Sequence, residues 1–407
     1  MALLSQIKND YQTIFVDEWS PYLAATLLVL VSSVLVASGG FWGVYGGIKN
    51  WGDWFNTFIG LGDILNISKE LSSPLENRIS IMNMCLVIGA LSAALISRQF
   101  RISHPPMLEF INGAIGGTLM GIGATLSMGC NVGAFFTPVT FSSPSGWAMW
   151  VGLLAGAFIG LKLMLWIMEN ITWGTKAPEA TQMPGLKQHA PWGGALILLL
   201  VVWWTIYWLT AEDRMLTTRA LYIPCGFAFG FIMHRARFCF SRGFREPFLT
   251  GEGEMSKAVM FAILLATVLF SVLFSKEVTD PYVGIPPSFW IGSLVGGLIF
   301  GVGMILAGGC ATGSLWRVGE GHLKLVVAVF FFSWSGSTFS GILKYWDVLA
   351  REDNLDLMVE ETMLGYQAWM PQMLGGWGWS HLATLSIVIV WFLLVRYNEK
   401  TEKFTVI

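Results

Sequence analysis

The stretch GGLIFGVGMILAGGCATGSL, residues 296 to 315, decides the fold because it joins an apolar helix to a glycine-rich break around a cysteine. It aligns without a gap with GGTLMGIGATLSMGCNVGAF, residues 116 to 135, with eight identities in twenty positions. The identical pairs are Gly116 and Gly296, Gly117 and Gly297, Gly121 and Gly301, Gly123 and Gly303, Leu126 and Leu306, Gly129 and Gly309, Cys130 and Cys310, and Gly133 and Gly313. Identity at this density predicts an internal repeat.

The composition of the chain is typical of a membrane protein. Of its 407 residues, 54% are hydrophobic and only 12% are charged. The apolar residues fall in runs of about 18 to 20, which indicates transmembrane helices. With 24 basic and 26 acidic side chains the chain is nearly neutral and has no basic tract, so a nucleic-acid partner is not expected.

Ten apolar runs predict ten transmembrane helices. They cover residues 21 to 40, 81 to 97, 110 to 128, 147 to 168, 193 to 210, 220 to 234, 257 to 275, 288 to 307, 325 to 343 and 379 to 396. Basic residues gather between alternate runs, as at Arg98 and Arg101 and again from Arg235 to Arg245. Because cytoplasmic loops are enriched in basic residues, both termini are expected in the cytoplasm.

The two copies of the repeat are predicted to run in opposite directions, since the first lies on the third helix and the second on the eighth. This is the plan of two inverted five-helix repeats, found in many transport proteins. The first repeat is expected to comprise residues 1 to 210, with five helices. The second is expected to comprise residues 211 to 407. The fold class is therefore an all-α integral membrane protein with broken helices or re-entrant turns at the Gly-Cys motifs.

The Gly-Cys motifs are the candidate site. Glycines let the chain leave the helix without steric cost and free backbone N–H groups that favour an anion. Such breaks are tolerated in a membrane only where they are buried in protein or line a cavity. The thiol adds a soft, weak contact, and conduction needs binding weak enough for release. The predicted substrate pathway comprises Cys130, Cys310, Cys239, Gly129, Gly309, Asn131 and Thr312.

Cys239 is a candidate because it lies in HRARFCFSRGFR, residues 234 to 245. Arg237 and Arg242 could attract an anion to the inner mouth, or could anchor a helix at the cytoplasmic headgroups. In a weaker alignment of the two halves, Trp42 stands opposite Cys239. The remaining cysteines, Cys85 and Cys225, are expected to be core residues. The glycine rows could equally serve as packing surfaces alone.

The five cysteines include no CxxC pair, so a disulfide framework and a zinc ribbon are not expected. The histidines show no metal-binding spacing, and no cofactor is expected. No ATPase phosphate-binding loop is visible, so transport would be passive or driven by an ion gradient.

At GCNVGAFF, RARFCFSRGFR and LAGGCATG the sequence resembles the bacterial YeeE/YedE family, also called the sulfur-transport domain family. The resemblance implies a pore of inverted repeats that takes thiosulfate across the inner membrane through contacts with cysteine thiols. Cys130 and Cys310 match the paired Gly-Cys sites of the family, and Cys239 matches a cysteine on the opening helix of one half. MGCNVGAFFTPV, RVGEGH and KYWD resemble the YedE branch, which is associated with selenium metabolism.

The function expected from these observations is that of a permease, not an enzyme. It would import a small sulfur-containing anion, most simply thiosulfate, through the bacterial inner membrane. A selenium compound is the alternative substrate. A membrane thiol-disulfide redox protein and a membrane anchor for a partner are the alternative classes. Expected partners are the sulfur or selenium anion, membrane lipid and, by the resemblance, a cytoplasmic sulfur carrier of the TusA/SirA type.

Overall fold

The protein is almost entirely helical in a computed structural model that describes residues 6, 9–68, 70–175, 179–181, 186–349 and 361–406. The helices are α2 (Pro21–Ala37), α3 (Tyr45–Phe58), α4 (Arg78–Ile96), α5 (Met107–Leu126), α6 (Thr137–Thr140), α7 (Pro144–Asn170), α8 (Leu186–Leu209), α9 (Arg214–Ala220), α10 (Tyr222–Arg235), α11 (Phe240–Leu249), α12 (Glu254–Ser275), α13 (Ile291–Ala307), α14 (Ala311–Glu320), α15 (Leu323–Tyr345), α16 (Met370–Met373) and α17 (Trp377–Thr401). Three further turns are the π-helical η1 (Gln12–Val16) and η2 (Asn131–Phe136) and the 3-10 helix η3 (Pro281–Gly284). Two antiparallel strand pairs complete the described fold, namely β1 (Ile102–His104) with β2 (Glu179–Thr181) and β3 (Glu361–Thr362) with β4 (Gly365–Tyr366).

The predicted class, an all-α membrane protein, is confirmed. Within the described residues nine helices are long and apolar enough to cross a membrane, and α2 with the bent segment before it makes a tenth. Some of these helices begin at a side chain that caps them. The side chain of Asn77 accepts hydrogen bonds from the first backbone N–H groups of α4, and Ser143 does the same for α7, whose first residue is Pro144.

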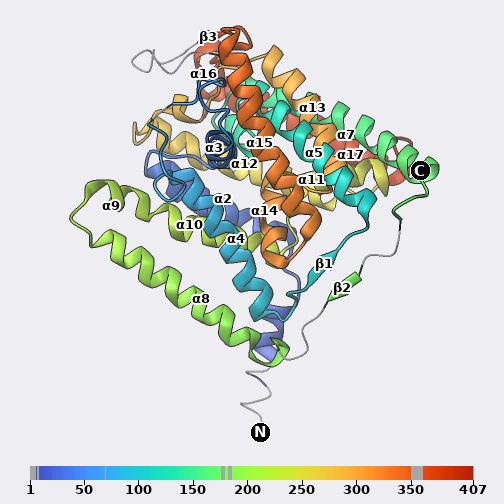
Figure 1. The fold of residues 1–407 in the computed structure, drawn as a ribbon. Coiled ribbons are helices and arrows are strands. Elements are labelled where there is room, and N and C mark those ends of the chain that lie inside the picture. The colour runs from blue at the N-terminus through green and yellow to red at the C-terminus, as the bar shows by residue number, and fades with distance from the viewer. Residues whose placement is uncertain are drawn as a thin grey trace.

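The helices α5 and α13, which carry the two copies of the repeated sequence, pack against each other and lie side by side in Figure 1. A Cβ on Gly116 would lie 2.6 Å from the carbonyl oxygen of Gly303, and a Cβ on Gly123 would lie 2.6 Å from that of Gly296. Only glycine permits so close an approach of two backbones. The order of these contacts shows that the two helices run antiparallel.

Equivalent glycines of the two copies also pack on equivalent neighbours. Gly117 and Gly121 of α5 face backbone atoms of α15, while Gly297 and Gly301 of α13 face backbone atoms of α7. α7 follows the first Gly-Cys motif along the chain and α15 follows the second. The glycine rows are therefore packing surfaces, as one of the two interpretations expected. The division into two inverted halves, residues 1–210 and 211–407, stays a prediction.

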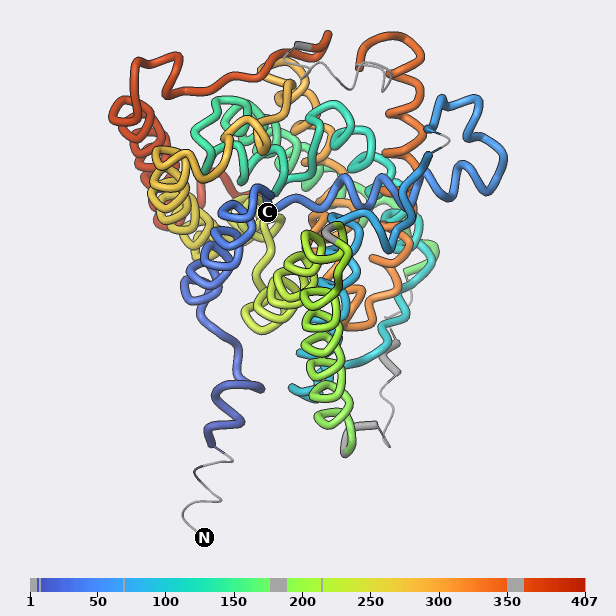
Figure 2. Tube along the Cα trace, turned by 90° about the vertical axis from the view of Figure 1, so that its left-hand side faces the viewer, coloured from blue at the N-terminus to red at the C-terminus, as the bar shows by residue number. Residues whose placement is uncertain are grey.

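The outer helices also pack in pairs. α10 packs on α4 through Gly226 and Gly230, and α2 packs on α12. α8 covers α4, and α17 covers α12. α8 lies at the edge of the bundle in Figure 1 and in front of the other helices in Figure 2. The short helices α3, α11 and α14 pack between these longer helices and bring the residues of the candidate site together.

Candidate functional site

Both Gly-Cys motifs break a helix in the same way, as predicted. The chain turns with a positive φ at Met128 after α5 and at Gly308 after α13. Cys130 then has φ −78° and ψ 179°, and Cys310 has φ −75° and ψ 177°. Each cysteine carbonyl accepts a 2.7 Å hydrogen bond from the N–H four residues later. Each thiol therefore lies at the start of a short helical segment in a fully buried place.

The structure brings Cys239 and Cys310 together. Their Sγ atoms are 3.6 Å apart, although the residues are 71 positions apart in the chain. The backbone N–H of Gly313 donates to the Sγ of Cys310 at 3.3 Å, and the hydroxyl of Thr312 lies 3.5 Å from the same sulfur. Cys239 is the residue before α11, so α11 and α14 both begin at this thiol pair.

Gly313 makes the thiol pair possible. A Cβ at this position would lie 2.5 Å from the Sγ of Cys239 and 3.1 Å from the Sγ of Cys310. Gly133 holds the equivalent place in the first motif, where a Cβ would only touch the Cα of Gly43 at 3.5 Å. At this position the two sulfur atoms fill the space in the second motif, whereas the first motif has room for a methyl group.

Cys130 lies in the first motif, and within the described residues no other thiol forms a hydrogen bond with it. Asn131 follows it and is fully buried, and neither its amide nitrogen nor its amide oxygen has a hydrogen-bond partner in the described part of the protein. The same is true of the Oγ of Ser314 in the second motif. Buried polar atoms without protein partners are rare in folded proteins, and these atoms are free to bind a water molecule or a ligand.

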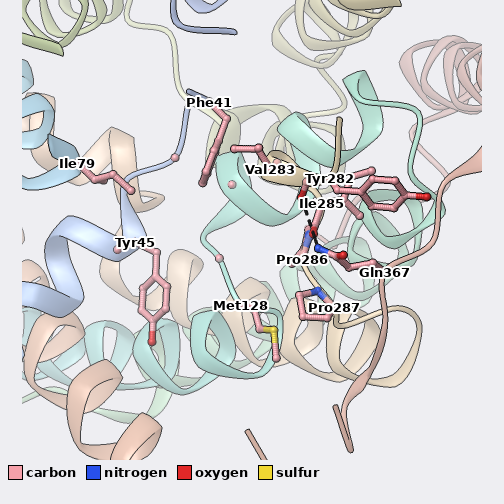
Figure 3. Close-up of a pocket in the computed structure, with 15 residues that line it drawn as sticks. Phe41, Tyr45, Ile79, Met128, Tyr282, Val283, Ile285, Pro286, Pro287 and Gln367 are labelled. Atoms are coloured by element: carbon pink, nitrogen blue, oxygen red, sulfur yellow. Dashed lines mark hydrogen bonds between the residues drawn. The ribbon is translucent and has the colours of Figure 1, made fainter. Parts of the chain in front are cut away.

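A pocket of about 320 Å³ opens onto the first motif (Figure 3). Phe41, Gly43, Tyr45 and the loop from Tyr282 to Pro287 form its walls, with Gln367 from the region before α16. Gln367 donates a 2.7 Å hydrogen bond to the carbonyl of Ile285. Gly129 and Gly133 of the first motif also line the pocket. None of the described residues that line it is charged.

An aromatic cluster separates the first motif from Cys239. Trp42 stacks on Phe229 with ring centroids 4.3 Å apart, and it also contacts Phe136 and Phe240. Phe136 ends η2, which follows Cys130, and Phe240 follows Cys239. The hydroxyl of Thr137 donates to the carbonyl of Trp42 at 2.6 Å. Trp42 thus packs against the first motif, as Cys239 packs against the second.

Arg237 and Arg242, the predicted anion-attracting residues, both form ion pairs. Arg237 Nη1 lies 2.6 Å from the buried carboxylate of Glu320, and Arg242 Nε lies 2.6 Å from Glu246. These partners neutralise much of the charge that an incoming anion would meet. Their role in attracting an anion stays a prediction.

Two further arginines, Arg245 and Arg317, interact electrostatically with Cys239 of the thiol pair. Arg245 belongs to the basic stretch around Cys239 that the sequence already indicated, whereas Arg317 was not predicted as a site residue. Arg317 Nη1 donates a 2.6 Å hydrogen bond to the carbonyl of Gly308. A signal was present, because Arg317 follows Cys310 by seven residues, or two helical turns, on one face of α14.

The chain is similar in sequence to known proteins. The model of the family described as Sulphur transport matches residues 5–159 and 235–406. The chain is 28% identical over 327 residues to the "Probable transporter YedE" of Salmonella typhimurium, covering 77% of this chain and 78% of that protein. It is 30% identical over 193 residues to the "Thiosulfate transporter TsuA" of Spirochaeta thermophila, covering 44% of this chain and 55% of that protein. It is 40% identical over 106 residues to the TsuA of Escherichia coli, covering 26% and 30%.

The residues that carried the resemblance lie within the matched ranges, and the matched ranges contain both broken helices. The relatives are named as transporters, in keeping with a bundle of membrane-spanning helices. The chain belongs to the sulphur transport family, the YeeE/YedE family of multi-pass membrane proteins.

Proposed function

We propose that this protein is a permease of the bacterial inner membrane that passes thiosulfate through a pathway lined by Cys130, Cys239 and Cys310. The observation that carries the proposal is the pair of thiols 3.6 Å apart at the start of two short helices, inside a membrane-spanning bundle. Thiols are weak, soft partners for a sulfur-bearing anion, so they bind it without preventing release.

The buried polar groups support the same pathway. Asn131 beside Cys130 and Ser314 beyond Cys310 have side-chain atoms without protein partners, and both residues are fully buried. An unpartnered buried donor costs about 1–3 kcal/mol, which a passing anion would offset by accepting its hydrogen bond. The pocket lined by Gly129 would supply an entrance on the side of Cys130.

The arrangement of the helices supports an inverted repeat of residues 1–210 and 211–407. The contact between Gly116 and Gly303 has its counterpart in the contact between Gly123 and Gly296, as a two-fold axis between α5 and α13 requires. In the proposed topology both termini lie in the cytoplasm, where a sulfur carrier of the TusA/SirA type would receive the anion. A selenium compound remains the alternative substrate.

Uptake into proteoliposomes tests the proposal, with thiosulfate, sulfate and selenite compared side by side. We expect uptake of thiosulfate and a loss of at least tenfold on Cys130→Ala or Cys310→Ala. Cys85→Ala is the matched control, because Cys85 is equally buried but belongs to a separate apolar cluster of α4, α8 and α10. Normal uptake by both pathway variants would refute the thiol-lined pathway, and uptake of selenite alone would favour the alternative substrate.

A second class of function has one observation in its favour. The sequence showed no vicinal cysteines, but the fold places Cys239 and Cys310 near enough to form a disulfide after a small movement. A membrane thiol-disulfide protein would cycle this pair between dithiol and disulfide. Alkylation of the purified protein with and without reductant separates the classes, because a permease is expected to show the same number of reactive thiols in both conditions.

A further inference from the structure

A group of three basic side chains, Arg245, Arg317 and Lys324, surrounds the turn that leads into Cys310; we name it the basic cluster. Arg317 donates to the carbonyl of Gly308, and a Cβ on Gly308 would lie 3.6 Å from the Nζ of Lys324. Arg245 comes from α11, and it interacts electrostatically with Arg317 and with Cys239. The three cations therefore come from α11, α14 and α15 to one place beside the thiol pair.

The carboxylates near the basic cluster are too few to neutralise it, because Glu246, which acts on Arg245, is already paired with Arg242 at 2.6 Å. Lys324 has one acidic partner, Glu109, with Nζ and Oε2 3.3 Å apart and the Glu109 side chain about half exposed. Within the described residues neither Arg245 nor Arg317 forms an ion pair, in contrast to Arg237 and Arg242. The Nε of Arg245 is buried and has no hydrogen-bond partner there.

The three cations have Glu109 to themselves and share Glu246 with Arg242, so they repel one another unless an anion joins them. Guanidinium groups match the oxygen atoms of tetrahedral oxyanions, because each presents a planar fork of N–H donors. The thiols of Cys239 and Cys310 offer no such donors and suit a polarisable sulfur atom. The two kinds of group, side by side, match the two ends of an anion that has oxygens at one end and a bare sulfur at the other.

We propose that the basic cluster binds the oxygen end of a divalent sulfur oxyanion while the thiol pair contacts its terminal sulfur. The inference rests on the proposed function and deepens it, because it gives the substrate an orientation and a holding site at the second motif. It also separates two tasks: the cluster selects for charge and oxygen, and the thiols select for sulfur. Sulfate shares only the first of these interactions.

The test is the anion-dependent thermal stability of the detergent-purified full chain at low ionic strength, titrated separately with sodium thiosulfate and sodium sulfate. An anion that binds the folded protein raises its unfolding temperature in a concentration-dependent way. We expect both anions to stabilise the wild type, with thiosulfate acting at the lower concentration. Arg245→Gln combined with Arg317→Gln is expected to weaken the binding of both anions by about tenfold or more, since each lost charged hydrogen bond is worth about 1.5–3 kcal/mol.

The cysteine variants complete the test. Cys239→Ala and Cys310→Ala are expected to weaken the binding of thiosulfate and to leave the stabilisation by sulfate unchanged. Arg396→Gln is the matched control, because Arg396 is an exposed basic residue near the end of α17. Arg245→Lys with Arg317→Lys keeps the charge and is expected to recover part of the response. If the glutamine double variant does not fold, Lys324→Gln replaces it.

Three results would overturn the inference: a wild type that neither anion stabilises, glutamine variants that respond like the wild type, or cysteine variants that lose both anions equally. The failure of the proposed function has a different signature. If the protein binds thiosulfate in this orientation but shows no uptake in proteoliposomes, the binding site is confirmed and the permease function is refuted.

Discussion

Gly313→Ala is the substitution that tests the packing of the thiol pair most directly. The added methyl group would begin 2.5 Å from the Sγ of Cys239, where carbon and sulfur atoms in contact lie at about 3.5–4.0 Å. One atom must therefore move by about 1 Å. The least costly movement is a rotation of the Cys239 side chain, which takes its sulfur away from Cys310.

The expected cost is that of overpacking a filled core, about 1–3 kcal/mol in the free energy of unfolding. The same methyl group is expected to separate the two sulfurs beyond their present 3.6 Å, so thiosulfate uptake falls together with stability. Glycine-to-alanine changes in helices are otherwise neutral or stabilising, which gives the prediction its sign.

Thermal unfolding of the purified protein, thiosulfate uptake and oxidative cross-linking of Cys239 to Cys310 check the prediction together. Gly133→Ala is the matched control at the equivalent position of the first motif, where the nearest atom is 3.5 Å away and no loss of stability is expected. Adding Cys239→Ala to Gly313→Ala removes the clashing sulfur and is expected to restore most of the lost stability. A Gly313→Ala protein that melts, cross-links and transports like the wild type would show that the thiols are not packed as described.

Two further predictions concern the surroundings of the site. Arg237→Gln removes the 2.6 Å partner of the buried Glu320 carboxylate, which among the described residues keeps only His322 at 3.4 Å and His234 at 3.8 Å. We therefore expect a loss in the free energy of unfolding that stays below the about 3–5 kcal/mol of a fully unpaired buried charge, most of it regained in the double variant with Glu320→Gln. A double-mutant cycle by thermal unfolding measures this coupling, and additive losses would contradict it. Trp42→Ala removes a buried ring stacked on Phe229 and is expected to cost about 3–5 kcal/mol, whereas Trp42→Phe keeps the stack and is expected to cost much less. Equal melting temperatures for these two variants would argue against the stacking.

The long apolar helices of the fold were predictable because twenty apolar residues in a row leave the chain few alternatives in a membrane. The predicted run at 257 to 275, for example, lies within α12 (Glu254–Ser275). The short helices α3, α11 and α14 escaped prediction, since they are 14, 10 and 10 residues long and carry polar residues among the apolar ones. Their helical form depends on tertiary packing more than on local sequence.

The candidate site also has parts that the sequence predicts and parts that it does not. The breaks at Cys130 and Cys310 could be predicted because glycines flank the same thiol twice at equivalent places. The pairing of Cys239 with Cys310 could not, because it depends on how α11 and α14 meet and the two residues are 71 positions apart. The same holds for charge, since no local pattern distinguishes Arg237, which meets Glu320, from Arg317, which meets no carboxylate in the described structure.

The two ends of the proposed pathway differ in charge, and this difference limits how import can work. The pocket at the Cys130 end has no charged lining among the described residues, whereas the basic cluster adjoins the Cys310 end. In the proposed topology a dianion moves toward a negative interior, which opposes entry by about 2.3 kcal/mol per charge for each 100 mV. That is about 4.6 kcal/mol for two charges, or a roughly two-thousandfold concentration ratio against import.

A holding site cannot supply this free energy, because it changes the rates of entry and exit without changing their equilibrium. Passive import therefore requires a reaction that removes the anion as it arrives. The basic cluster suits such a reaction, since it would keep the oxygen end of the anion beside α14 while the sulfur remains at the thiols. Uptake by proteoliposomes without a membrane potential is then expected to stop at equal concentrations, and accumulation beyond that level would require ion coupling instead of removal.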